Sequence, residues 1–196
     1  EELVRDELHL AAAQAMAASV DERNVHDQRH AESVARLASV IAAEMKMDED
    51  DIHRIRVAGL LHDIGLVTVP EEIINKRDHL SADEWRRIKE HPEVGETILK
   101  HIASLESFLP MVRHHHEHYD GAGYPDGLAK EKIPLGARIL AVADAFQAMI
   151  SDRPYRRALT TDQALAELQM SSGTQFDPEI VDTVVSLFRN LQEKAS

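Results

Sequence analysis

Apolar side chains recur at helical spacing along nearly the whole chain, and this period constrains the fold more than any other feature. Residues 31–45 place them on one stripe of a helix, and residues 52–61 and 178–191 repeat the pattern. Ser81 followed by Glu84 is a capping-box signature at the start of a further helix. No segment alternates apolar and polar residues as a half-buried strand does. The sequence therefore predicts an all-α fold of about seven to nine helices.

Composition limits the class of protein and the type of site. The 196 residues are enough for one sizeable core, and 22 Lys and Arg against 35 Asp and Glu give a net charge of -13. This acidity argues against binding of a nucleic-acid polymer, which requires a basic face. There is no cysteine, so any metal would be held by nitrogen and oxygen ligands. No apolar run reaches the roughly 18 residues of a membrane span, and we expect a cytoplasmic protein.

Two parts are predicted along the chain. Residues 21–196 form the main domain, and residues 1–20 form an alanine-rich, mildly amphipathic helix. This helix either packs on the core or continues a signalling helix from an upstream sensory domain. The sequence begins without methionine, so we expect it to be part of a longer protein. Helix starts are predicted at Asp162, Asp177 and Pro178.

Some ionisable residues stand where the apolar pattern predicts burial. Asp144 lies in an almost wholly apolar helix, and a buried carboxylate requires a partner, for which Arg138 or a metal ion is a candidate. His62 and Asp63 follow another apolar helix, which we expect to end at Gly65. Two polar side chains at such a helix end can bind one ion or lie between two.

Four more histidines belong to the same pattern. His30 begins an apolar stripe, His91 precedes a proline and is predicted to cap a helix, and His115 and His116 precede a glycine-rich loop. Each residue alone also has a structural explanation, such as a hydrogen-bonded core histidine. Together the seven residues offer five imidazoles and two carboxylates, more than one tetrahedral zinc ion needs. They suit two octahedral ions bridged by Asp63.

The order of these residues resembles that of the HD superfamily of metal-dependent phosphohydrolases. The stretch HHEHYDGAGYPDGL, with IPLGARILAVAD and SDRPYR, closely resembles the HD-GYP subfamily, the cyclic di-GMP phosphodiesterases of bacterial signalling. The likeness covers roughly residues 21–196. It implies a bundle of helices around a buried centre of two or three metal ions, usually iron or manganese.

The resemblance also assigns metal ligands. One metal would be held by His30, His62, Asp63 and Asp144. The other would be held by His91, His115 and His116 and would share Asp63, which is also the expected catalytic residue. His26 stands where members with a third metal carry glutamate. We favour two divalent ions, with a third site that uses the His26 imidazole as the alternative.

The reaction implied by the resemblance is hydrolysis of cyclic di-GMP or a related cyclic dinucleotide. Two ions roughly 3.5–4 Å apart neutralise a phosphodiester and make hydroxide available near neutral pH. The ring would open to linear pGpG, with a second cut to GMP as a further expectation. The GYP loop, Gly123-Tyr124-Pro125, is expected to shape the substrate site. Arg153 and Arg156 would bind phosphate or guanine through their planar forks, with surface salt bridges as the alternative.

One departure from the family pattern leaves the activity open. Leu66 stands where the family commonly has a lysine that is expected to contact a substrate phosphate. A leucine cannot do this, so the alternative function is a catalytically weak or inactive receptor for a cyclic dinucleotide, or a protein-interaction module. A second copy of the chain is a further candidate partner.

Overall fold

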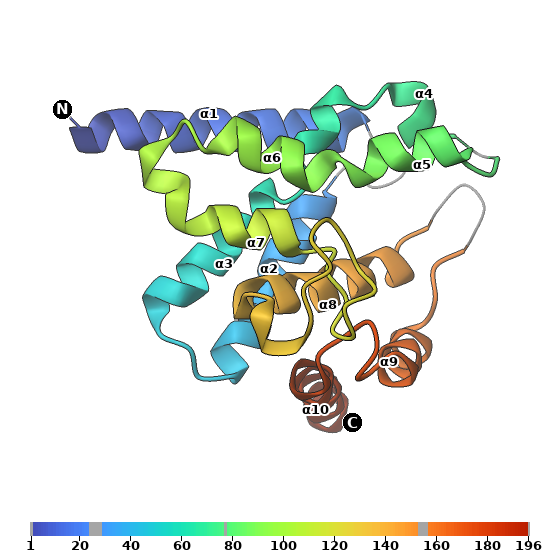
Figure 1. Ribbon diagram of the computed structural model, residues 1–196. Coiled ribbons are helices and arrows are strands. Elements are labelled where there is room, and N and C mark those ends of the chain that lie inside the picture. The colour runs from blue at the N-terminus through green and yellow to red at the C-terminus, as the bar shows by residue number, and fades with distance from the viewer. Residues whose placement is uncertain (1, 24–28, 77, 153–156, 196) are drawn as a thin grey trace.

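The computed structural model describes residues 2–23, 29–76, 78–152 and 157–195. Within these ranges the chain is helical and forms no strand, which confirms the all-α prediction (Figure 1). The elements are α1 (Glu2–Arg23), α2 (His30–Glu44), α3 (Glu49–Leu61), η1 (Ile64–Thr68), α4 (Glu71–Ile74), α5 (Ala82–Lys89), α6 (His91–Leu99), η2 (Ala103–Phe108), α7 (Leu109–His114), η3 (Lys130–Lys132), α8 (Leu135–Ile150), α9 (Thr161–Met170) and α10 (Pro178–Ala195), where η marks a 3-10 helix.

The predicted number of helices was too low for the described part of the chain. Ten α-helices are present there, and two of them, α4 and α7, have only 4 and 6 residues. Such short helices span too few turns to produce a recognisable apolar period. Among the described residues, none of the helices has the length and apolar character needed to cross a membrane.

Helix starts follow local side-chain chemistry. The capping box of α5 is present, because Ser81 accepts from the backbone of Glu84 and the Glu84 side chain accepts from the backbone of Ser81. The predicted start of α10 at Pro178 is also confirmed. The start predicted at Asp162 was wrong, because Thr160 caps α9 in a second capping box and Asp162 lies in the first turn.

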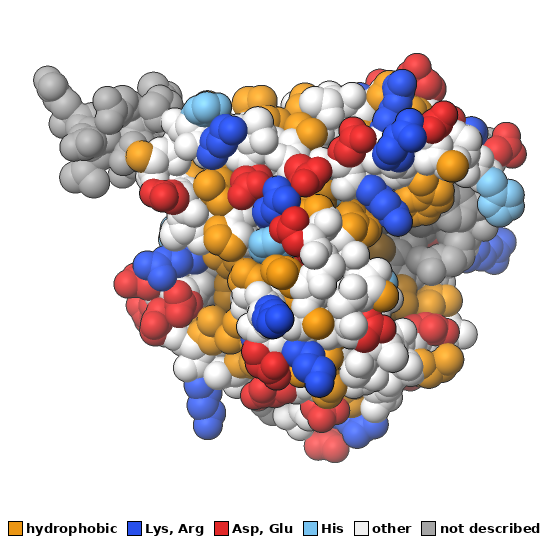
Figure 2. Space-filling view, viewed as in Figure 1, with side chains coloured by type: hydrophobic (Ala, Val, Ile, Leu, Met, Phe, Trp, Pro, Cys, Tyr) orange, Lys and Arg blue, Asp and Glu red, His pale blue; other side chains and the backbone are white. Residues whose placement is uncertain are grey.

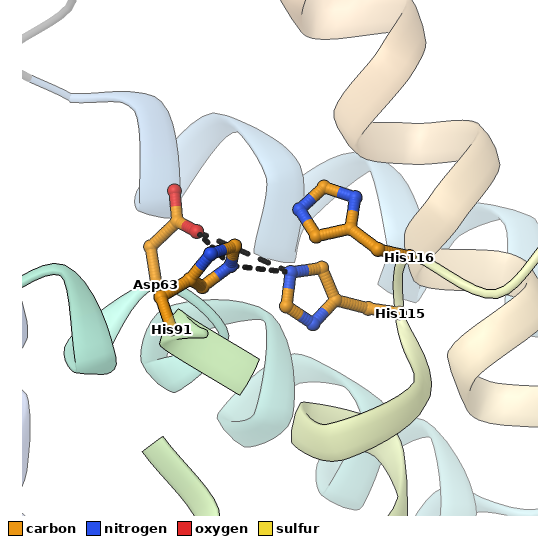
Figure 3. Close-up of side chains that lie close together, drawn as sticks. All are labelled: Asp63, His91, His115 and His116. Atoms are coloured by element: carbon orange, nitrogen blue, oxygen red, sulfur yellow. Dashed lines mark hydrogen bonds and ion pairs between the residues drawn. The ribbon is translucent and has the colours of Figure 1, made fainter. Parts of the chain in front are cut away.

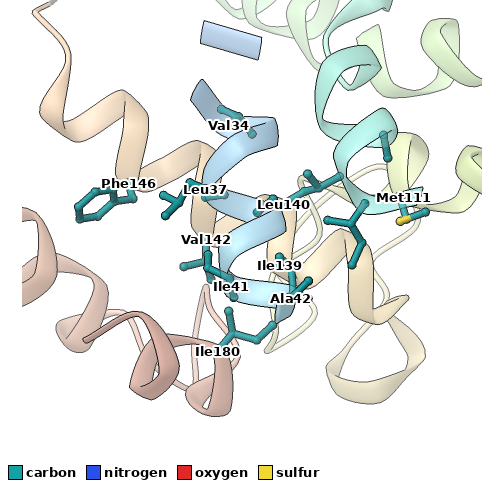
Figure 4. Close-up of a cluster of buried hydrophobic side chains, with 14 of the residues drawn as sticks. Val34, Leu37, Ile41, Ala42, Met111, Ile139, Leu140, Val142, Phe146 and Ile180 are labelled. Atoms are coloured by element: carbon teal, nitrogen blue, oxygen red, sulfur yellow. The ribbon is translucent and has the colours of Figure 1, made fainter. Parts of the chain in front are cut away.

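The core is built around α2 and α8, whose apolar faces meet at the centre of the molecule (Figure 4). Val34, Ile41 and Leu140 are completely buried there. In Figure 1, α1, α5 and α6 lie along one side of this centre, and α9 and α10 lie on the opposite side. The segments that follow α3 and α7 therefore end beside α8, where they can bring polar side chains together.

Gly65 fixes the distance between η1 and α6. A Cβ atom at this position would lie 2.0 Å from the carbonyl oxygen of His91 and 2.8 Å from the backbone nitrogen of Gly95. The prediction that Gly65 ends the preceding helix was wrong, since α3 ends at Leu61 and Gly65 lies inside η1. Gly65 instead allows two backbones to touch, and this contact places Asp63 next to His91.

Candidate metal centre

Three of the histidines are oriented by the same local contact. The Nδ1 atoms of His62, His91 and His115 each lie 2.7 Å from the carbonyl oxygen three residues earlier. A carbonyl only accepts, so each Nδ1 donates, and the Nε2 atom of the neutral ring keeps its lone pair. The accepting carbonyls lie in the last turns of α3, α5 and α7, where helices leave carbonyls without an intrahelical partner. Each imidazole is thus fixed with Nε2 pointing away from its own helix.

His91 differs slightly from its prediction. It is the first residue of α6, and Glu90 is the cap residue, so the predicted capping role was wrong by one position. The proline at position 92 occupies the next helical position, as its missing N–H allows. His91 is buried, and its ring faces the carboxylate of Asp63 instead of its own helix start.

One group that could hold a metal ion consists of Asp63, His91, His115 and His116, whose ligand atoms lie within 4.8 Å of one another. Figure 3 shows the imidazoles of His91 and His115 pointing toward the same carboxylate. Asp63 Oδ1 lies 3.2 Å from Nε2 of His91 and 4.0 Å from Nε2 of His115. The two Nε2 atoms are 3.2 Å apart. These residues come from α6 and from the segments after α3 and α7.

A second group consists of His30, His62 and Asp144, also within 4.8 Å of one another. His30 Nε2 lies 2.9 Å from Oδ1 of Asp144, so α2 and α8 meet here through polar atoms. Arg138 was therefore the wrong partner for Asp144. Its guanidinium pairs with Asp177 and donates to the carbonyl of Ile133, on another side of α8.

The two groups adjoin, and Asp63 lies between them. The ring centroids of His62 and His115 are 5.1 Å apart. Asp63 Oδ2 faces Nε2 of His62 at 3.4 Å, whereas Oδ1 faces Nε2 of His91 at 3.2 Å. One carboxylate thus presents an oxygen to each group, as a ligand bridging two ions does.

A buried nitrogen supports the fit of this site to a metal. Among the described residues, Nε2 of His62 is buried and has no hydrogen-bond partner. A buried polar atom without a partner costs free energy, and such atoms are rare unless they have another role. Neutral imidazole nitrogens and carboxylate oxygens are ligands for divalent transition metals. The donor set therefore fits divalent metal binding.

The electrostatics of the site keep three of the ligands, Asp63, His115 and His116, in their binding forms. Burial acts to raise the pKa of Asp63, but the neighbouring imidazoles of His62 and His91 hold that pKa well below the ordinary value. Burial and the neighbouring His116 hold the pKa of His115 well below the ordinary value. Burial also lowers the pKa of His116 to about 4. The carboxylate is therefore ionised and these two imidazoles are neutral, as metal binding requires.

The GYP loop lies against the second of these imidazoles. The Tyr124 ring stacks on the His116 ring, with centroids 5.0 Å apart, and the Tyr124 backbone nitrogen donates to the carbonyl of His116. Gly123 packs so closely that a Cβ atom would lie 2.2 Å from the backbone nitrogen of His118. The GYP loop was predicted to shape the substrate site, and its position beside the metal ligands is compatible with that role.

A residue that the sequence reasoning missed holds this loop. Glu117 is buried, and its two carboxylate oxygens accept from the backbone nitrogens of Asp126 and Leu128 at 2.7 and 3.1 Å. Because it follows the two ligand histidines directly, it ties the far end of the loop to the metal centre. The signal was available, since a glutamate between a buried His pair and a glycine-rich loop requires a partner.

The end of α1 contacts both ligand-bearing segments. Asp21 is buried and accepts from the backbone nitrogen of Ala31, next to His30. Arg23 donates to the carbonyls of Val67 and Val69 at 3.2 and 2.6 Å, in the segment that follows Asp63. The sequence gave no sign of these contacts, because they join residues far apart in a pattern that local spacing does not reveal.

Some predicted site residues lie outside the described part of the chain. These are Arg153 and Arg156, the expected phosphate or guanine contacts, and His26, the residue at the place of a third metal ligand. Leu66 lies in η1 and is half-buried. It follows Asp63 by one turn, and the backbone nitrogen of Leu66 donates to the Asp63 carbonyl.

The chain matches the family model of the HD domain over residues 14–180. The cyclic di-GMP phosphodiesterase response regulator RpfG of Xanthomonas campestris pv. campestris is 38% identical over 174 residues, which cover 87% of this chain and 46% of that protein. The 3'3'-cGAMP-specific phosphodiesterase 3 of Vibrio cholerae is 37% identical over 160 residues, which cover 82% of this chain and 35% of that protein. The chain thus spans less than half the length of these relatives.

A solved structure has the same fold. Bd1817, described as an HDG"Y"P protein from Bdellovibrio bacteriovorus, superposes with a TM-score of 0.71 and 15% sequence identity. The match covers 96% of this chain and 73% of that one. At this identity the likeness concerns the fold alone, and it agrees with the predicted helical bundle.

Proposed function

The chain belongs to the HD-domain family, and on this premise we propose that it is a metal-dependent phosphodiesterase that hydrolyses cyclic di-GMP. The product would be linear pGpG, with GMP as the product of a second cut. The relatives named for cyclic di-GMP and for 3'3'-cGAMP both support a cyclic dinucleotide as the substrate class. The HD-GYP resemblance of the glycine-rich loop supports the same class.

One observation carries this proposal, namely the position of Asp63 between two groups of ligands. Its two oxygens face His62 and His91 at 3.4 and 3.2 Å, on opposite sides of the carboxylate. A carboxylate with a purely structural role needs an imidazole partner at only one of its oxygens. A bridging carboxylate needs one partner on each side, because it fixes the spacing of two ions.

In this proposal each group of residues has a separate role. Bound divalent ions supply positive charge to the phosphodiester and hydroxide near neutral pH. Asp63 sets the spacing of the two ligand groups. The backbone carbonyls before His62, His91 and His115 keep those rings oriented, and such outer contacts tune metal sites. Tyr124 covers His116 and forms one wall of the substrate site.

We propose iron or manganese as the metal, two ions per chain. Nitrogen and oxygen ligands without thiolate suit both metals, and the family resemblance favours them. The seven proposed ligands are His30, His62, Asp63, His91, His115, His116 and Asp144. A cytoplasmic location, an upstream sensory domain and a homodimer stay predictions.

Leu66 favours a second candidate function, a receptor that binds the dinucleotide with little or no turnover. Its aliphatic side chain cannot neutralise a phosphate or assist a leaving oxygen. The metal ligands would be unaffected, because Leu66 is not among them. The two functions therefore differ in the rate of product formation and agree in metal content and ligand binding.

A combined metal and product assay tests the proposal. Protein prepared anaerobically with iron or manganese is analysed for metal and incubated with cyclic di-GMP, and pGpG is followed by chromatography. We expect about two ions per chain and metal-dependent product. Binding without product would establish the receptor function instead.

Asp63→Ala provides the corresponding variant. It removes the carboxylate that faces both ligand groups, so metal content and hydrolysis should both fall by at least about 10-fold. Asp83→Ala removes a carboxylate from the exposed surface of α5 and serves as the control. Unchanged metal content and hydrolysis in Asp63→Ala would contradict the proposed centre.

A further inference from the structure

A groove on α5 lies next to the metal centre and has no role in the proposed chemistry. It encloses about 720 Å³, and its lining includes Trp85, Arg86, Lys89 and Pro125. On the face seen in Figure 2, hydrophobic side chains and Lys or Arg side chains lie beside one another over α5. The groove thus combines an aromatic ring with positive charge in a chain that is acidic overall.

The GYP loop lies between the groove and the metal ligand His116. The Nζ atom of Lys89 lies 5.2 Å from the centroid of the Tyr124 ring. That ring stacks on His116, and the next residue, Pro125, lines the groove. Tyr124 and Pro125 of the GYP loop therefore join the groove to the edge of the metal centre.

The Trp85 side chain does not pack in the hydrophobic core. Its side chain is 49% exposed, and α5 contains no buried residue. An indole ring left in water loses the free energy that burial would give it, and its face stays open for a ligand to stack on. Among the described residues, Lys89 has no carboxylate within ion-pair distance, so its charge is available to an anion.

The acidic residues of the lining have other positions or partners than Lys89. Glu93 pairs with Arg113 at 3.1 Å, and Arg113 also holds Glu96 and Asp126. Glu90 is the remaining acidic residue in the lining. Arg86 pairs with Asp83 at 2.8 Å, so Lys89 is the cation of the lining whose charge stays available beside the Trp85 ring.

We infer that this groove binds the second nucleotide of a cyclic dinucleotide, with its base stacked on Trp85 and its phosphate near Lys89. The inference rests on the proposed function, because a cyclic dinucleotide placing one phosphodiester at the metals must hold its other nucleotide outside the centre. An aromatic ring stacks any nucleobase, and a neighbouring cation attracts the phosphate. The groove supplies both at the edge of the site.

Fluorescence gives a direct test, because Trp85 is the only tryptophan of the chain. The manganese-loaded protein is titrated with a hydrolysis-resistant phosphorothioate analogue of cyclic di-GMP. Stacking of guanine on the indole should quench the emission saturably. Inorganic phosphate, which can reach the metals but has no base, should leave the emission unchanged. Binding of the analogue measured by calorimetry without any change in emission would overturn the inference.

Kinetic variants give an independent test. Trp85→Ala should raise KM for cyclic di-GMP about 5- to 150-fold, the range for loss of one base stack, and leave kcat within about twofold. Trp85→Phe keeps a ring and should recover most of this loss. Lys89→Ala should raise KM as well. Met170→Ala removes another exposed apolar side chain, 78% exposed on α9, and should leave KM unchanged.

A small substrate separates binding from chemistry. Bis(p-nitrophenyl) phosphate has one phosphodiester and no second nucleotide, so its hydrolysis should be equal in the parent protein and in Trp85→Ala. A parallel loss with this substrate would mean that Trp85 supports the fold, and the inference would fail while the proposed function stands. If the parent protein does not bind cyclic di-GMP at all, both the inference and the proposed function fail.

Discussion

Replacing Gly65 by alanine tests whether the contact between η1 and α6 sets the metal centre. The new Cβ would lie 2.0 Å from the His91 carbonyl oxygen, and Cβ atoms essentially never approach other atoms closer than 3.0 Å. The two backbones must therefore separate by about 1 Å, since packed interiors have no room to absorb the overlap. Asp63 and His91, only 3.2 Å apart, lie on the two segments that would move.

The size of the effect follows from packing and from ligand geometry. Forcing extra atoms into a packed contact costs typically about 1–3 kcal/mol, and here the obstacle is backbone, which yields less than a side chain. For a chain of this length each 1 kcal/mol lowers Tm by about 2–4 °C. Displacement of supporting contacts lowers metal affinity by about 10- to 100-fold. We expect Gly65→Ala to show both losses.

The assay combines thermal unfolding of the metal-free protein with metal titration, so that stability and affinity are measured separately. Gly95→Ala is the matched control, because the atom nearest to its Cβ would be Val112 Cγ1 at 3.1 Å, against 2.0 Å to backbone at Gly65. It also exchanges glycine for the best helix former, so its Tm should change little. A Gly65→Ala protein with the Tm and manganese affinity of the parent would refute the reasoning.

Further variants test three other parts of the molecule. Leu66→Lys restores the charge expected in the family and should raise kcat for cyclic di-GMP at unchanged metal content; an unchanged kcat would mean that this position does not limit turnover. Glu117→Ala leaves two loop amides without acceptors and should cost about 1–3 kcal/mol in denaturant unfolding, with faster proteolysis of the loop as a second readout. Arg23→Met removes the donors to Val67 and Val69 and should lower stability by roughly 1–3 kcal/mol; no loss would show that α1 does not support the segment after Asp63.

The sequence predicted the fold class well because most helices are long enough to show their period. The apolar stripe of residues 31–45 corresponds to α2, and the stripe of 178–191 lies within α10. Helices α4 and α7 are too short to show an apolar period. The capping box at Thr160 was overlooked, and Asp162 was predicted as the helix start instead. Local pattern thus identified elements better than it identified their boundaries.

The site was only partly predictable for a different reason. A buried ionisable residue signals that it needs a partner, and this signal singles out the seven ligand candidates from the sequence. The signal does not identify which residue or ion is the partner. Arg138 is near Asp144 in sequence, yet α-helical geometry turns it toward Asp177, whereas His30 arrives from a distant helix. Partners that come from tertiary packing leave no local mark in the sequence.

The backbone contacts of the histidines explain why helix ends can carry so much of this site. A helix leaves its last carbonyls without partners. An imidazole three residues later along the chain donates a hydrogen bond to such a carbonyl through Nδ1. His62, His91 and His115 use this contact at the ends of three different helices. Each ring is then fixed by the same backbone that positions it, so its Nε2 direction depends on how the helices pack. Metal affinity should therefore respond to changes in helix packing, such as the one at Gly65, even where no ligand is touched.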